Sequence, residues 1–206
     1  MKQKYTFVLF CSYDPDYFMQ VPYQSDTEIR NIFRFENVDF SLQSGLQAVI
    51  PFSVKTLWQG NLSLTGVRVQ HKASHFHSLS FNRKAYIARV SLKNTFNLSA
   101  EPNLKLTVDG FYMTPGMIQG PYDMSRIWNV SAGLKWTSRN DRASLVLKAN
   151  DIFRSGTPEL TVNEGTQWNR MHLLNDDRCL SLSFIWKFNG YKAKQHERID
   201  TSRFGK

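Results

Sequence analysis

Hydrophobic and polar residues alternate along most of this chain with a period of two. In 128–136 every even position is apolar and every odd position is small or polar. In 84–99 the apolar series that begins at Tyr86 alternates with a polar series that includes Arg89 and Lys93. A strand places successive side chains on opposite faces of its sheet. The pattern therefore predicts strands with one apolar and one polar face.

We predict eight such strands, over about 4–12, 38–50, 57–70, 84–99, 103–114, 126–138, 142–153 and 178–189. Proline placement supports these limits, because proline cannot donate to a sheet ladder. The seven prolines fall between the alternating runs: Pro15, Pro22, Pro51, Pro102, Pro115, Pro121 and Pro158.

The predicted connections alternate between short and long. The short ones are 51–56, 100–102 and 139–141, and the long ones are 13–37, 71–83, 115–125 and 154–177. Outer-membrane barrels have short periplasmic turns and long outer loops, with aromatic girdles at both interfaces. Aromatic residues do lie near the ends of the apolar faces: Trp58, Tyr86, Tyr112, Trp128, Trp136, Trp186 and Phe188. We therefore predict an all-β fold, an antiparallel up-and-down transmembrane β-barrel of about eight strands.

Composition leaves one alternative. The chain has 206 residues, 41% of them apolar, and a formal net charge of +9. Its longest unbroken apolar run is 7–11, far short of the ~18 residues of a membrane helix. The charge also suits a soluble, basic β-sandwich that binds a polyanion, which would need basic and exposed aromatic residues on one face. Here the bases lie opposite the aromatic and aliphatic residues, which favours the barrel and argues against a nucleic-acid partner.

Several motifs resemble the TonB-dependent receptor type of outer-membrane β-barrel protein. The stretch 106–122 carries an aromatic pair, then Thr-Pro, then Gln-Gly-Pro-Tyr, similar to a strand and outer loop of that family. The run Asn150, Asp151, Ile152 and Phe153 resembles the motif that closes the family's penultimate strand. Arg178 to Phe188 resembles the final strand, in which Trp186 and Phe188 stand where the barrel-assembly machinery recognises a terminal aromatic.

The resemblance, over about 36–206, implies a protein of the cell outer membrane that takes part in binding and uptake of a nutrient, a metal chelate or a glycan. It implies contact with outer-membrane lipid and the assembly machinery, and with a plug domain and TonB supplied elsewhere. Full receptor barrels of this type have 22 strands. We therefore expect 1–189 to be a barrel segment, either closed by itself or an open part of a larger barrel, and 190–206 to be a basic tail.

The polar faces of the predicted strands carry most of the candidate binding residues. Seven basic residues are expected to face the lumen, where they would attract anionic solutes or pair with a plug: Arg68, Arg89, Lys93, Lys105, Lys135, Lys148 and Lys187.

His71, His75 and His77 lie close together in one predicted loop and are candidate metal ligands. No Cys or carboxylate lies nearby to complete the set, so a polar outer loop is the favoured interpretation, with no metal and no cofactor. The sequence contains no nucleophile elbow, phosphate loop or metalloprotease helix, so we expect no enzyme. Cys11 and Cys179 fall near the outer ends of the first and eighth strands, and free thiols are expected unless those strands are neighbours.

Overall fold

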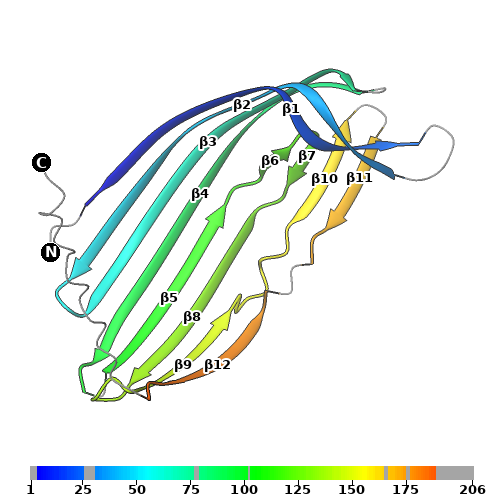
Figure 1. Cartoon of the computed structure of the whole chain (residues 1–206). Coiled ribbons are helices and arrows are strands. Elements are labelled where there is room, and N and C mark those ends of the chain that lie inside the picture. The colour runs from blue at the N-terminus through cyan, green and yellow to red at the C-terminus, as the bar shows by residue number, and fades with distance from the viewer. Residues whose placement is uncertain are drawn as a thin grey trace, which may run out of the picture.

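The computed structural model describes residues 4–25, 31–76, 79–101, 103–164, 167–174 and 177–188, and most of these lie in strands. One antiparallel sheet of eight strands, in the order β1-β2-β3-β4-β5-β8-β9-β12, forms the body of the molecule. The sheet is strongly curved (Figure 1). Its strands are β1 (Thr6–Gln24), β2 (Asn31–Val54), β3 (Trp58–Phe76), β4 (Leu79–Ser99), β5 (Asn103–Met113), β8 (Ile127–Thr137), β9 (Ala143–Asn150) and β12 (Cys179–Trp186).

The predicted all-β, up-and-down antiparallel architecture is confirmed. Tight turns that include 55–57, 100–101 and 138–142 join strands at one end of the sheet, which we call the turn end. The long connections lie at the opposite end, which we call the loop end. No helix in the described part of the chain is long and apolar enough to cross a membrane.

The long connections differ from the prediction because much of their length is strand. β1 runs on to Gln24 and pairs with β2 from Asn31, and β3 continues to Phe76. Pro15, Pro22 and Pro51 lie inside strands, so their use as loop markers was wrong. Pro15 and Pro22 are tolerated because β1 is an edge strand, whose second side has no ladder to break.

A second sheet occupies the loop end beyond β5, β8 and β9. Its order is β11-β10-β7-β6, formed by β6 (Gly116–Gln119), β7 (Tyr122–Met124), β10 (Glu159–Glu164) and β11 (Gln167–His172). These strands fill the stretches predicted as the loops 115–125 and 154–177. Figure 1 shows them beneath the curled ends of β1 and β2.

A small core forms where the extended strands curl over. Met19, Val38, Ala73 and Phe81 are buried together there, and Tyr17 packs against them. Asp16 has a φ of 52°, in the left-handed region that reorients the strand before Tyr17 and Met19. The protein therefore has little buried interior, and its organisation depends on the two faces of the main sheet.

The main sheet is not closed. β1 and β12 are its two edges, and no pairing joins them in the described residues. The predicted barrel is thus present as an open eight-stranded arc, consistent with a part of a larger barrel. The predicted tail, 190–206, lies outside the described residues.

Candidate functional site

Cross-strand pairing divides the main sheet into an apolar and a polar face. Directly paired residues in an antiparallel sheet point to the same side. On one side Leu64 pairs with Val90, and Leu106 pairs with Leu134. We call this apolar face the outer coat. Large side chains on it are well exposed although they are apolar, for example Leu180 at 74%. Such exposure suits contact with lipid rather than water.

The outer coat becomes polar at the level of Arg68. Arg68 pairs with Tyr86, and towards the loop end the same face carries Gln70 opposite Lys84 and Lys72 opposite Asn82. A hydrogen-bond chain runs here from the Arg68 guanidinium to Gln70 (3.3 Å) and from the Gln70 amide to Asn82 (2.8 Å). The prediction that Arg68 faces the lumen is therefore wrong. Its basic charge suggested the polar face, but the register places it with the aliphatic series of β3.

Aromatic side chains mark the turn end of the outer coat. The Trp58 ring stacks on Phe96 with ring centroids 5.8 Å apart and meets Phe52 edge-on at 5.0 Å. Its indole N–H donates to Asn94 at 3.1 Å. Trp58 and Arg68 are ten residues apart on β3, about 33 Å of strand at ~3.3 Å per residue. At a tilt of about 45° this spans about 23 Å, close to the apolar band of outer-membrane barrels.

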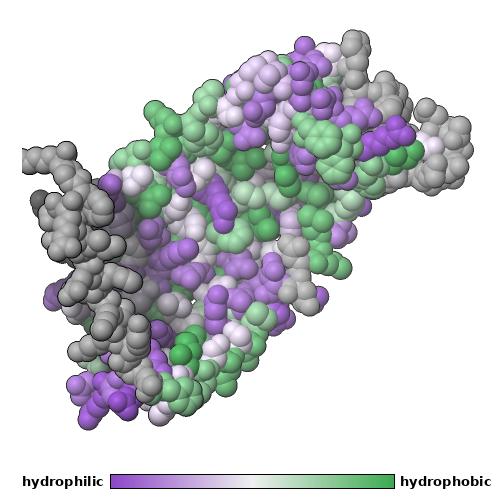
Figure 2. All heavy atoms as spheres, in the orientation of Figure 1, coloured by the Kyte–Doolittle hydropathy of each residue, from purple (hydrophilic) through white to green (hydrophobic). Residues whose placement is uncertain are grey.

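The opposite face, which we call the inner wall, is polar. Gln47, Thr65 and Arg89 form one cross-strand row on it, from β2 to β4. Figure 2 shows hydrophilic residues gathered inside the hollow of the molecule. The register places five of the seven basic candidates on the inner wall: Arg89, Lys93, Lys105, Lys135 and Lys148. The sixth, Lys187, lies just beyond β12, where its backbone N–H donates to the Arg142 carbonyl at 2.9 Å.

Four of the five inner-wall cations have no acidic residue directly opposite them in the described sheet, and the fifth, Lys93, is opposite Asp109. Lys105 and Lys135 are directly opposite each other, and Asp109 is the one acidic residue on the inner wall of β4, β5, β8 and β9. No ion pair joins any of these five cations to a carboxylate in the described part of the chain. The Arg89 guanidinium instead lies 4.7 Å from the centroid of the Phe111 ring. The inner wall therefore carries an uncompensated positive charge.

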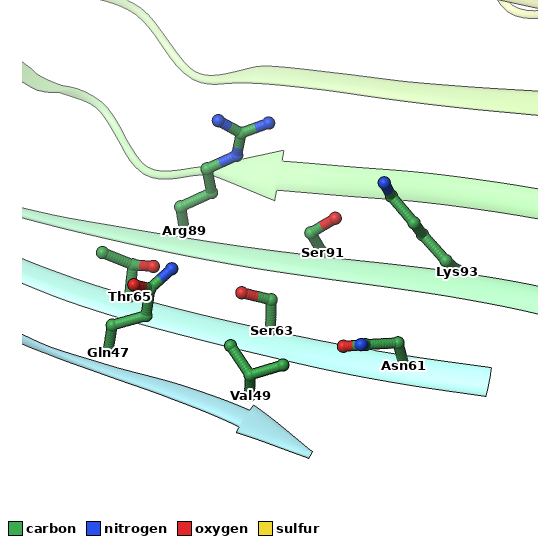
Figure 3. A pocket seen from close by; sticks show the side chains of 8 residues that line it. All are labelled: Gln47, Val49, Asn61, Ser63, Thr65, Arg89, Ser91 and Lys93. Atoms are coloured by element: carbon green, nitrogen blue, oxygen red, sulfur yellow. The ribbon is translucent and has the colours of Figure 1, made fainter. Parts of the chain in front are cut away.

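A cavity of about 330 Å³ lies on the inner wall against β2, β3 and β4. Figure 3 shows the side chains that line it, which come from neighbouring strands on one face: Gln47, Val49, Asn61, Ser63, Thr65, Arg89, Ser91 and Lys93. Sequence reasoning selected the two cations and missed the hydroxyl and amide groups. Their alternation with aliphatic residues was the signal that could have found them.

The Asn-Asp-Ile-Phe run anchors the turn that ends β9. Asp151 has a φ of 42° and is almost fully buried. Its carboxylate accepts hydrogen bonds from the backbone N–H groups of Ser155 (2.9 Å) and Gly156 (3.1 Å) and from the Ser155 hydroxyl (3.2 Å). Desolvation opposes the charged form, but these hydrogen bonds hold the Asp151 pKa below its ordinary value. Asn150 donates to the Cys179 sulfur at 3.2 Å, and Phe153 packs against the Trp128 ring.

The predicted histidine cluster does not form a metal site in the described residues, where no three His, Cys, Asp or Glu side chains come together. The side chain of His75 and the whole of His77 lie outside what the structure describes. His71 is buried, and neither of its ring nitrogens has a hydrogen-bond partner in the described residues. Burial lowers its pKa and keeps the imidazole neutral.

A hairpin of β6 and β7 packs against the inner side of the loop end. Arg83 donates to the Pro121 carbonyl at 2.8 Å and to the Asp123 carboxylate at 2.6 Å. Gly120, with a φ of 54°, sits so close to Met19 that a Cβ there would lie 2.8 Å from the Met19 sulfur. Nearby, burial raises the pKa of Tyr122 to about 12. This hairpin belongs to the stretch whose Gln-Gly-Pro-Tyr motif suggested an outer loop.

Cys11 and Cys179 are exposed free thiols. They lie on the two edge strands, which are not neighbours in the described sheet. Cys11 pairs with Ser44 and so faces the outer coat, whereas Cys179 pairs with Asn150 on the inner wall. Opposite faces would prevent a bond between them even if the edges met.

Comparison with known protein families decides what this two-faced sheet is. The sequence model of the outer membrane protein beta-barrel family matches residues 1–186. The chain belongs to this family. An outer membrane protein beta-barrel family member resides in the cell outer membrane, and the alternative of a soluble β-sandwich is wrong. No curated protein and no solved structure gives a significant match. In this family setting the outer coat faces lipid, and the loop end is the outer side.

Proposed function

We propose that the chain is part of a TonB-dependent receptor barrel and takes part in binding and uptake of a nutrient, a metal chelate or a glycan. The observation that carries the proposal is the contrast between the outer coat and the inner wall. A band bounded by Trp58 and Arg68 contacts lipid, while the inner wall presents Arg89, Lys93 and their hydroxyl neighbours to solvent. A solute that crosses the membrane along the inner wall meets charged and hydrogen-bonding side chains throughout its path.

The sequence motifs support the receptor type specifically. The buried Asp151 accepts the hydrogen bonds that hold the turn of the Asn-Asp-Ile-Phe run. The residues that carry this part of the resemblance therefore stabilise the fold. The β6–β7 hairpin, which carries the Gln-Gly-Pro-Tyr run, covers the inner side of the loop end. The open arc is compatible with a larger barrel, in which neighbouring strands would pair with β1 and β12.

The partners follow from the same proposal. Outer-membrane lipid contacts the outer coat, and the assembly machinery reads the terminal aromatics Trp186 and Phe188. A plug and TonB supplied elsewhere would provide the energised step. The inner-wall cations face hydroxyl groups rather than a platform of stacked aromatics, so we propose no nucleic-acid partner and no enzymatic reaction.

Uptake by cells with and without the gene tests this function. We expect deletion to abolish accumulation of a labelled ferric chelate or oligosaccharide, and an inner-membrane uncoupler to do the same in the parent cells. Restoring the intact gene should restore uptake. Uptake that survives deletion for every solute tested, or that continues with the inner membrane uncoupled, would refute the receptor assignment.

A further inference from the structure

We infer that the cavity at Arg89 and Lys93 is a binding site for an oxyanion-bearing, hydroxyl-rich solute, such as an acidic sugar. The inference rests on the proposed function, because it names the chemical class of solute that the inner wall would receive. The proposed function names two nutrient classes, and the cavity adds where the solute binds and which charge it carries.

The charge of the site comes from two cations that form no ion pair in the described residues, although Lys93 is directly opposite Asp109 of β5. Arg89 and Lys93 lie on the same face of β4 and line the same cavity. The Arg89 guanidinium is held over the Phe111 ring, which fixes the group and leaves its N–H donors available to a ligand. An arginine fork binds carboxylate or phosphate oxygens in a bidentate manner, and a lysine adds a compact charge.

Hydroxyl and amide groups surround these cations. Thr65 is directly opposite Arg89, Ser63 is opposite Ser91, and Asn61 is opposite Lys93. Each of these side chains both donates and accepts hydrogen bonds, as a sugar hydroxyl requires. The four-residue spacing of the two cations corresponds to about 13 Å along β4. The cavity volume of about 330 Å³ is within the range of small-ligand sites. The site thus offers an anion contact at each end and hydroxyl contacts between.

The remaining lysines of the inner wall lie nearer the turn end and also attract an anionic solute. Lys105 and Lys135 are directly opposite one another, and like charges in this position destabilise a sheet. An anion placed between them would remove that cost. Lys148 is opposite Gly133, the residue two positions before Lys135. An anionic solute that leaves the Arg89 and Lys93 site therefore meets further positive charge along the wall.

Calorimetric titration of the refolded full chain in zwitterionic detergent tests the inference. The probes are D-glucuronate, inorganic phosphate and D-glucose. We expect glucuronate to bind with an affinity that falls as salt rises, phosphate to bind more weakly, and glucose not to bind measurably. Glucose binding as tightly as glucuronate would overturn the charge preference. Phosphate binding as tightly as glucuronate would overturn the role of the hydroxyl groups.

Matched variants locate the site. The double variant Arg89→Gln, Lys93→Gln should weaken glucuronate binding at least about tenfold, the size of one charge-assisted hydrogen bond. Arg68→Gln removes a charge from the other face of the sheet and should leave the affinity unchanged. Arg89→Lys, Lys93→Arg keeps the charge and should retain most of the binding. Heat-modifiable migration on a gel verifies that each variant is folded.

Three results would contradict the inference: equal losses in the double variant and in Arg68→Gln, no loss in either, or binding of polyglutamate with no binding of glucuronate. The last would indicate an acidic polypeptide as the occupant. Failure of the inference is distinguishable from failure of the receptor function. Anion binding without any effect of gene deletion on uptake would refute only the function, and energised uptake without anion binding would refute only this site.

Discussion

Arg68 and Tyr86 are directly opposite each other on β3 and β4, on the face that contacts lipid. On the side of this pair nearer the turn end, the same face carries Leu64 opposite Val90. On the side nearer the loop end it carries Gln70 opposite Lys84. Tyrosine and arginine both combine an apolar body with a polar tip, which suits a membrane interface. The pair therefore marks the outer boundary of the lipid-facing band.

A charge introduced within the band should cost far more than the same charge beyond it. Leu64→Arg places a guanidinium near mid-membrane and should reduce the free energy of unfolding by about 2–4 kcal/mol. Asn82→Arg, on the same face of the neighbouring strand β4 but beyond Tyr86 and exposed, should cost about 0–1 kcal/mol. Urea unfolding in lipid vesicles measures both values. Equal costs for the two variants would place the membrane boundary elsewhere.

The turn between β6 and β7 should depend on the absence of a side chain at Gly120. Gly120→Ala requires a left-handed alanine whose Cβ would meet the Met19 sulfur, a strain of about 1–3 kcal/mol. We expect faster amide exchange and faster proteolysis of the hairpin, with the main sheet unchanged. Gly66→Ala is the control, because nothing lies within 4 Å of its added Cβ. Similar protection in the two variants would show that the hairpin is not held by this contact.

Asp151 should stabilise the turn after β9 in its charged form. Asp151→Asn should cost about 1–3 kcal/mol, because the N–H groups of Ser155 and Gly156 lose a charged acceptor. The folded pKa is below the ordinary ~3.9, so this stabilisation is complete above about pH 4 and is lost as the pH falls below it. Urea unfolding between pH 3 and pH 7 should show this acid loss in the parent and not in the variant. The exposed Asp141→Asn variant should behave like the parent.

His71 should make the outer end of the protein less stable in mild acid. The buried imidazole stays neutral in the fold, whereas in the unfolded chain it takes up a proton near pH 6.5. Stability should therefore decrease as the pH falls through about 6.5. His71→Leu removes two buried nitrogens that have no hydrogen-bond partner in the described residues, so it should raise stability, and more at pH 5 than at pH 8. A gain in His71→Leu that does not vary with pH would refute the assignment.

The alternation of residue types predicted the strands of the main sheet because the face in contact with lipid is apolar and the face in contact with water is polar. Beyond Arg68 the lipid-facing series ends, while residues of the other face, such as Ala73, are buried in the small core of the loop end. The strands continue although the alternation that marks the membrane band stops, so β1 to β4 were predicted too short. Arg68 was misplaced for a related reason: its charge was taken as a sign of the inner wall, although parity along β3 places it on the outer coat. The role of Asp151 depends on a turn conformation that no periodicity encodes.

Only part of the candidate site could be predicted from the sequence. Arg89 and Lys93 stand out by charge, so they were identified. The register between β3 and β4 brings Ser63, Thr65 and Ser91 together. That register cannot be predicted from the spacing of residues within one strand.

Spin labels at two neighbouring residues of β3 test whether one face of the main sheet contacts lipid and the other contacts water. Leu64→Cys and Thr65→Cys are made in a chain whose own cysteines are replaced by Cys11→Ser and Cys179→Ser, and each labelled protein is reconstituted in lipid vesicles. We expect the label at Leu64 to collide mainly with dissolved oxygen, which concentrates in lipid, and the label at Thr65 to collide mainly with a water-soluble nickel chelate. Equal accessibility at the two positions, or the reverse pattern, would contradict a sheet with one lipid-facing and one water-facing side.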